Sequence, residues 1–248
     1  ALGGALFATD RPVSADAAAP GPIERLLRTA PLSRRLARRA PRGARALVYK
    51  EIMTNLRDPM QISHVFLIVG IVLLHFLNLS EVPYDLHPAA RTLVAFLNLA
   101  LVGFLSAAVA VRFVYPSVSL EGQPFWRMEA APLLPWHFVL IKFLAGWLPL
   151  AGAAVVTVAV SNHLVGVSAG LALLWIGATL AVSTVITAFG IALGLALPAF
   201  DRRNVFEISS SSGGIVFMVL SLLYVMLVIV LLARPTSTAA FGRPLAAD

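Results

Sequence analysis

Cysteine is absent from this chain of 248 residues, which excludes disulfide bonds, thiolate metal sites and a cysteine nucleophile. Charge is also scarce, since only 12% of the residues are charged and a soluble globular domain has about 25%. Hydrophobic residues make up 59% of the chain. Lipid accepts apolar side chains on the outside of a fold, whereas water does not. We therefore expect an integral membrane protein.

The sequence motifs of several common enzyme classes are missing as well. The only two lysines, Lys50 and Lys142, do not follow a glycine-rich loop, so the chain has no Walker A phosphate cradle. It also has no His-Glu-x-x-His motif, and its five histidines are isolated from one another. From these absences we expect a chain that is not an enzyme and that holds no metal or cofactor.

Five apolar stretches are each long enough to cross a hydrocarbon layer, which takes about 20 helical residues. They cover residues 62–79, 92–114, 138–161, 167–197 and 213–233. The predicted fold class is all-α: a polytopic transmembrane helix bundle of about five spans, over a domain of residues 59–233. A tail, 234–248, follows it.

The region before the bundle divides into two predicted parts. Residues 1–43 are rich in proline, alanine and arginine and are typical of a basic linker. In residues 44–58, Val48, Ile52 and Leu56 recur four apart, which predicts an amphipathic helix lying among the lipid headgroups. The polar and terminating residues of this interfacial helix are Lys50, Arg57, Asp58 and Pro59.

The distribution of basic residues predicts the orientation in the membrane. Eleven of the 19 lysines and arginines precede residue 61, and short cytoplasmic loops carry an excess of such residues. The N-terminal segment is therefore expected in the cytoplasm. The loops then alternate, with 115–137 and 198–209 inside and 80–91 and 162–166 outside. Membrane lipids account for the basic block, so we expect no nucleic-acid partner.

The segment 111–137 is predicted to be cytosolic, yet it is rich in proline and aromatic residues instead of the polar residues of a plain linker. Two interpretations of its aromatic side chains stay open. They form a belt at the membrane interface, or they dock a cytosolic partner. The aromatic residues concerned are Phe113, Tyr115, Phe125, Trp126 and Trp136.

Part of this segment resembles a known family. The resemblance is carried by Arg112-Phe113-Val114-Tyr115-Pro116-Ser117-Val118-Ser119-Leu120-Glu121-Gly122, then Phe125-Trp126, Ala131-Pro132 and Lys142-Phe143. Lys50-Glu51, Arg57-Asp58-Pro59, Pro198, Phe200-Asp201 and Gly213-Gly214 agree with it in order. Over about residues 45–233 the chain looks like the C-terminal half of a bacterial ABC exporter permease, the membrane subunit of a type-2 ABC transporter, without its final helix.

This resemblance implies a permease subunit of an exporter in the bacterial plasma membrane, with ATP on a separate cytosolic ABC ATPase. A second permease copy or half and membrane lipids are the other expected partners. The implied site has two parts. The residues expected to couple to the ATPase are Glu121, Gly122, Phe125, Trp126, Arg127 and Pro132. Asp201 and Arg202 belong to the last cytosolic loop.

Two other function classes stay open. A polytopic enzyme acting on lipid would need acidic or histidine side chains gathered at one membrane depth, and four cytosolic acids could converge in this way. They are Glu121, Glu129, Asp201 and Glu207. A scaffold without transport activity is the other class, although a simple anchor would not need a loop so dense in aromatic residues.

Overall fold

The computed structural model describes residues 59–80, 87–122, 135–202 and 204–241, and all regular secondary structure in these residues is helical. The helices are α4 (Pro59–Ser80), α5 (Pro88–Phe113), α6 (Pro116–Ser119), α8 (Pro135–Val165), α9 (Ala169–Ala196), α10 (Val205–Ser209) and α11 (Ser212–Phe241). The expected all-α helical bundle is confirmed.

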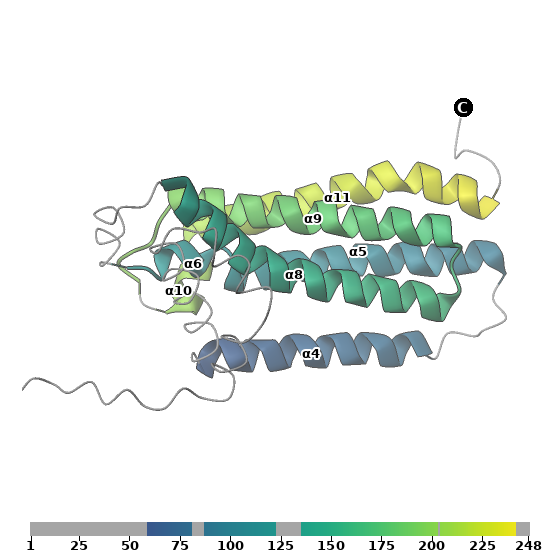
Figure 1. Cartoon of the computed structure of the whole chain (residues 1–248), viewed down its shortest axis with the longest axis horizontal. Helices are drawn as coiled ribbons and strands as arrows, with labels where there is room; N and C mark the ends of the chain where they lie inside the picture. The colour runs from purple at the N-terminus through teal and green to yellow at the C-terminus, as the bar shows by residue number, and fades with distance from the viewer. Residues whose placement is uncertain (1–58, 81–86, 123–134, 203, 242–248) are drawn as a thin grey trace, which may run out of the picture.

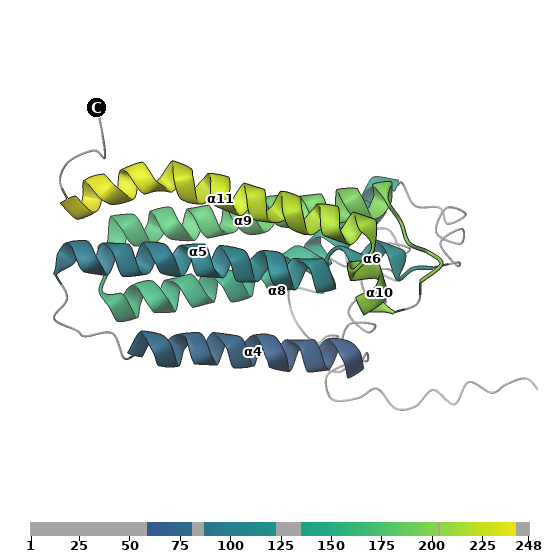
Figure 2. The same cartoon turned by 180° about the vertical axis from the view of Figure 1, so that it is seen from behind.

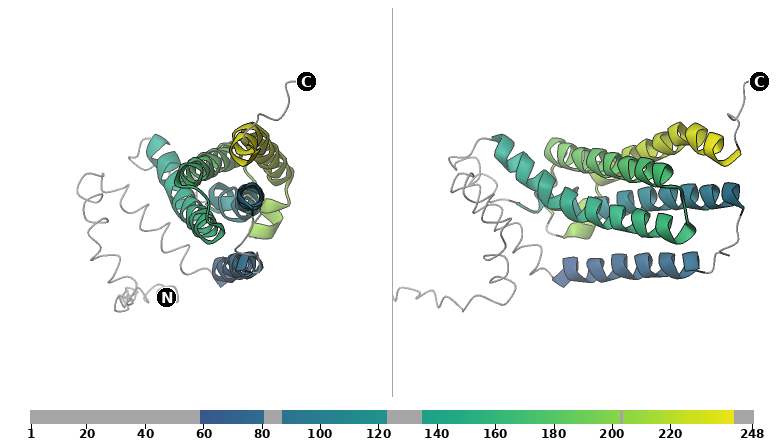
Figure 3. Two further views of the ribbon diagram at one scale, coloured as in Figure 1. Left: turned by 90° about the vertical axis from the view of Figure 1, so that its right-hand side faces the viewer. Right: turned by 45° about the vertical axis from the view of Figure 1, so that its right-hand side comes forward.

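The long helices run alongside one another (Figures 1 and 2). Helices α5, α8, α9 and α11 pack together, and α4 lies at one side, chiefly against α8. The short helices α6 and α10 gather at one end, which we call the α6 end; the opposite end is the far end (Figure 1). The view along the bundle axis in Figure 3 shows α4 set apart from the other four long helices.

Four helical segments of the described chain are long and apolar enough to cross a membrane. They are Ala89–Ser119, Trp136–Val165, Ala169–Ala196 and Ser212–Ser237. The first expected span, 62–79, forms helix α4. The protein is therefore a membrane protein built from a helix bundle.

Proline, glycine and a histidine cap explain several helix boundaries. Helix α5 begins with Pro88, whose fixed φ angle suits the first helical turn, and His87 Nδ1 accepts a hydrogen bond from the Ala89 amide at 3.3 Å. Gly166 follows α8 with a φ angle of +72°, a left-handed conformation that favours glycine. Helix α8 continues through Pro149.

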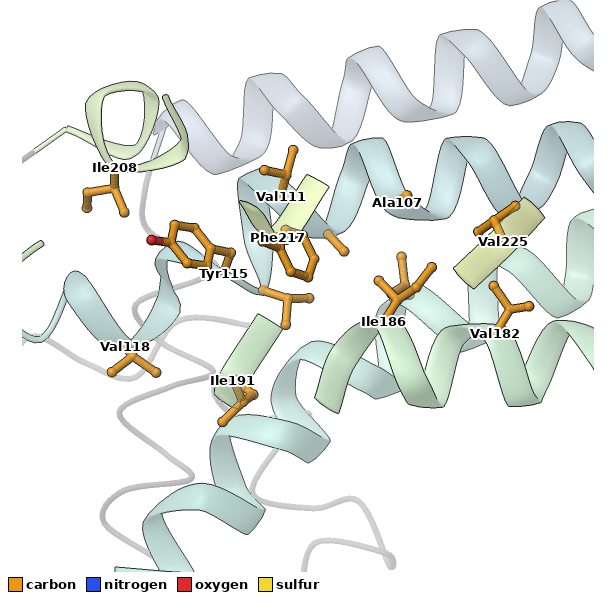
Figure 4. Packing of buried hydrophobic residues seen from close by; sticks show 13 residues of the cluster. Ala107, Val111, Tyr115, Val118, Val182, Ile186, Ile191, Ile208, Phe217 and Val225 are labelled. Carbon is orange, nitrogen blue, oxygen red and sulfur yellow. The ribbon is translucent and has the colours of Figure 1, made fainter. Parts of the chain in front are cut away.

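Buried apolar side chains form two clusters along the bundle. The cluster nearer the α6 end includes Tyr115, Ile186, Ile208 and Phe217, and Figure 4 shows these residues converging from four helical segments. The other cluster contains Trp175 together with side chains of α4, α5 and α8. Many outward-facing side chains are also apolar, which suits a surface in contact with lipid.

Candidate functional site

At the α6 end, the chain continues from α5 through two residues, Val114 and Tyr115, into α6. Helix α5 ends at Phe113, and Pro116 begins the single turn of α6. Tyr115, Val118 and Ser119 are all fully buried at 0% exposure. The Gly122 amide closes the turn on the Ser119 carbonyl at 3.0 Å, and its φ angle of +61° favours glycine. This segment, residues 114–122, therefore packs inside the fold and is not a surface loop. We call it the α6 wedge.

The Tyr115 side chain joins this wedge to two helices. Its hydroxyl donates a hydrogen bond to the Leu197 carbonyl at 3.3 Å and lies 3.3 Å from the Ser211 hydroxyl. Its ring stacks on Phe217 of α11 with a centroid distance of 5.7 Å, as Figure 4 shows. One side chain thus contacts the end of α9 and the beginning of α11.

Glycines make room for the wedge. A Cβ atom at Gly213 would collide with the Tyr115 hydroxyl, and one at Gly194 would lie 3.0 Å from the Tyr115 carbonyl oxygen. A Cβ atom at Gly190 would lie 2.7 Å from Val114 Cγ1. Close approach of helices through small residues is common in membranes. Here the glycines of α9 and α11 leave room for Val114 and Tyr115.

The loop after α9 is tied to the same wedge. The Ala199 amide donates a hydrogen bond to Ser119 Oγ at 3.1 Å, and Ser209 Oγ donates to the Val111 carbonyl at 2.8 Å. Asn204 caps α10 by accepting a hydrogen bond from the Phe206 amide. The short helix α10 is thereby fixed against α5 and α6.

A buried ion pair completes the site. Lys142 Nζ of α8 lies 2.6 Å from Glu121 Oε1, and the two side chains are 4% and 7% exposed. The same ammonium group donates a hydrogen bond to the Ser117 carbonyl at 2.9 Å and lies 5.7 Å from the centre of the Phe138 ring. Attraction between two charges is strong when water is excluded, so the pair fixes the end of the α6 turn to α8.

We call the group formed by Tyr115, Ser119, Glu121, Lys142 and Gly213 the α6 junction. Of these five residues, only Glu121 was expected from the sequence as a site residue. Lys142 could have been found, because a lysine in a strongly apolar helix is expected to pair with an acid. The role of Tyr115 had no such signal, since an aromatic residue near a helix end also fits a membrane-interface belt.

The other expected site residues lie in different places. Gly122 is at the end of the α6 turn. Asp201 is exposed, and the exposed Arg202 donates a hydrogen bond to the Glu207 carbonyl at 2.9 Å. Pro59 is the first residue of α4. The residues outside the described part of the chain are Phe125, Trp126, Arg127 and Pro132, together with Lys50, Arg57 and Asp58 of the interfacial helix.

The acids required for lipid chemistry do not form a metal-binding group in the described part of the chain. No three histidine or acidic side chains there are arranged to hold a metal ion. Glu121 is engaged with Lys142, and Glu129 lies outside the described residues. In the described residues, Glu121 is therefore one half of an ion pair that joins the end of the α6 turn to α8.

A family model described as "Putative ATP-binding cassette" matches residues 22–243. No curated protein and no solved structure matches the chain significantly.

This match corrects three expectations. The matching family is described by an ATP-binding cassette, so the assignment to an exporter permease family is wrong. The function expected from that assignment, a permease subunit coupled to a separate ATPase, is overturned with it. The expectation of a chain without enzymatic activity is wrong as well, because the family is named for ATP binding. Apolar composition identifies a membrane protein but not its role. The absence of a Walker A motif excludes only one kind of phosphate-binding loop.

Proposed function

This chain belongs to the putative ATP-binding cassette family, and we propose that it works as a membrane-embedded part of an ATP-driven transport assembly. The four helical segments of the described chain that are long and apolar enough to cross a membrane support the membrane location. The α6 junction supports a mechanical role, because it connects the elements that a movement at this end would have to displace together.

The observation that carries the proposal is the set of contacts made by the α6 wedge. Glu121 binds Lys142 of α8, Tyr115 contacts the end of α9 and the start of α11, and Ser119 holds the loop before α10. A push on this short wedge therefore reaches three long helices at once. Packed helices respond to such a push by shifting between discrete arrangements.

We further propose the surroundings in which the junction works. The positive-inside pattern of the sequence favours a cytoplasmic α6 end and a cytoplasmic N-terminal segment, in a multi-pass arrangement in a bacterial plasma membrane. A second copy or half of the membrane region would pack beside the bundle, and lipid would cover the remaining apolar surface.

The absence of cysteine makes a direct test possible. Spin labels are attached at L120C, beside the junction, and at L173C, near the far end; these positions are 39% and 70% exposed in the native chain. The purified assembly is reconstituted in lipid nanodiscs, and the distance between the labels is measured by pulsed electron paramagnetic resonance with and without ATP and vanadate.

We expect nucleotide to change this distance. The control is a label pair at L164C and L173C, both near the far end, whose separation should stay constant. If the assembly hydrolyses ATP while the distance from residue 120 to residue 173 stays constant, the junction does not receive the movement. If no ATP binds to the assembly, the proposal of an ATP-driven function is wrong.

A further inference from the structure

The far end of the bundle holds a second group of polar side chains, which the proposed function does not use. We call it the far-end cluster. Its members are His75 on α4, Asn98 on α5, Ser161 and Asn162 on α8, and Trp175 on α9. Counting residues from the adjacent helix ends, and with a rise of about 1.5 Å per residue, all of them lie within about 15 Å of the far end.

Several contacts bring these side chains together. His75 Nε2 lies 3.4 Å from Ser161 Oγ, which joins α4 to α8. Trp175 packs in one apolar cluster with Leu99 and Val158, which are neighbours of Asn98 and Ser161 on their helices. These polar side chains thus come from four helices near the far end of the bundle.

The cluster contains polar atoms that are buried but have no hydrogen-bond partner. Asn98 is 4% exposed, Asn162 is 3% exposed, and in both residues Nδ2 and Oδ1 are unpartnered. Trp175 is 0% exposed, and its Nε1 is also unpartnered. Each such group costs about 1–3 kcal/mol when it is left unsatisfied. Native structures satisfy nearly all buried polar groups, so these exceptions point to a missing partner.

The surroundings indicate what kind of partner fits. The unpartnered atoms include both donors and acceptors, and the five side chains contain no carboxylate, ammonium or guanidinium group. A hydroxyl or amide group can donate and accept, whereas a phosphate or carboxylate would place negative oxygen atoms against the two asparagine oxygens. The partner that these atoms suit is therefore uncharged and polar.

Helix α4 indicates where the rest of such a partner would lie. Leu73, Leu74 and Leu77, which flank His75, are 57%, 60% and 64% exposed. In a membrane these side chains face hydrocarbon. A molecule with a polar headgroup in the cluster could therefore keep its apolar chain in lipid against α4, without crossing the bundle.

We propose that the far-end cluster binds the uncharged, hydroxyl- or amide-bearing headgroup of a membrane amphiphile. The site is separate from the α6 junction, and its occupation does not depend on ATP. Asn98, Asn162 and Trp175 supply the hydrogen bonds, and His75 with Ser161 connects the site to α4.

Monooleoylglycerol, whose headgroup is an uncharged diol, is a suitable probe. The full chain is placed in nanodiscs, and its thermal unfolding midpoint is measured with increasing monooleoylglycerol or, for comparison, with oleate, which has the same chain and a charged headgroup. We expect monooleoylglycerol to raise the midpoint by about 5 °C at saturation, since a ligand stabilises the state that binds it. Oleate should leave it unchanged.

The variants N98L and N162L test the site itself. Each replaces an unpartnered amide by an apolar side chain of similar size, so we expect a folded protein that no longer responds to monooleoylglycerol. S106A is the control, because Ser106 is buried on α5 but bonds the Val102 carbonyl of its own helix. It should respond like the native chain.

Three outcomes would overturn the proposal. If N98L and N162L respond to monooleoylglycerol as strongly as the native chain does, the effect comes from the bilayer and not from the cluster. If oleate raises the midpoint equally, the headgroup is not selected by charge. If the native chain does not respond and N98L is less stable than the native chain, the amides are satisfied by trapped water in a purely structural role.

Discussion

The α6 junction and the far-end cluster differ in whether their buried polar groups have hydrogen-bond partners. At the α6 end, the hydroxyl groups of Tyr115 and Ser119 and the charges of Glu121 and Lys142 all have partners in other segments. At the far end, the amides of Asn98 and Asn162 have none. In the described residues, unpartnered buried atoms also occur outside the far-end cluster, among them His137 Nδ1 near the start of α8 and Ser221 Oγ on α11. Polar groups that all have hydrogen-bond partners stabilise one arrangement of helices. Polar groups without partners can form hydrogen bonds with a ligand.

The largest expected effect comes from breaking the ion pair at the α6 end. K142M removes the ammonium group and leaves the Glu121 carboxylate buried, so we expect a loss of about 3–5 kcal/mol in the free energy of unfolding. The measurement is equilibrium unfolding in mixed micelles of detergent and sodium dodecyl sulfate. The double variant E121L/K142L is the control: with neither charge present, its stability should return to near the native value. A small loss in K142M would mean that water reaches the pair.

The bundle itself could be predicted from composition and from apolar length, because lipid imposes both. The spans 92–114, 138–161, 167–197 and 213–233 each fall largely within one long helix. Helix α8 begins at Pro135, a residue that suits the first helical position, and α11 continues through Pro235 to Phe241, beyond the expected boundary at 233. A helix that lipid surrounds can continue until its backbone meets a glycine or a polar loop.

The α6 junction was less predictable. Glu121 was named from a motif, but its partner Lys142 lies 21 residues later, and only the fold shows that a short turn brings them together. Tyr115 was expected in an aromatic belt or on a docking surface, yet Tyr115 and Val118 are fully buried. Apolar character alone does not distinguish a wedge inside the bundle from a patch on its surface.

The glycines around Tyr115 should tolerate little added volume. In G213A the new methyl group would meet the Tyr115 hydroxyl, so we expect a loss of about 1–3 kcal/mol in unfolding free energy. The double variant G213A/Y115F removes the hydroxyl oxygen that blocks the methyl group and should recover part of that loss. G152A on α8, where an added Cβ meets nothing within 4 Å, is the matched control and should be close to native. Equal losses in G213A and G152A would show that Tyr115 does not fill the space beside α11.

A smaller loss is expected when a partnered hydroxyl group is removed from the junction. In S119A the Ala199 amide loses its acceptor, at a cost of about 1–2 kcal/mol. Because Ser119 holds the loop that leads to α10, amide hydrogen exchange should also become faster in residues 199–202. A stability loss without faster exchange would mean that the loop is held by other contacts.

The smallest effect is expected at a serine that is equally buried but has no partner. Ser221 on α11 is 0% exposed, like Ser119, and its Oγ is unpartnered. S221A removes a buried polar atom without breaking a hydrogen bond, so its stability should equal or slightly exceed that of the native chain, by at most about 1 kcal/mol. S119A is measured under the same unfolding conditions. Each substitution removes one fully buried hydroxyl oxygen, so the difference in stability between the two variants measures the contribution of the Ser119 hydrogen bond. If both variants lose stability equally, Ser221 has a hydrogen-bond partner in the membrane. Lack of a partner would then distinguish only the far-end cluster from the α6 junction.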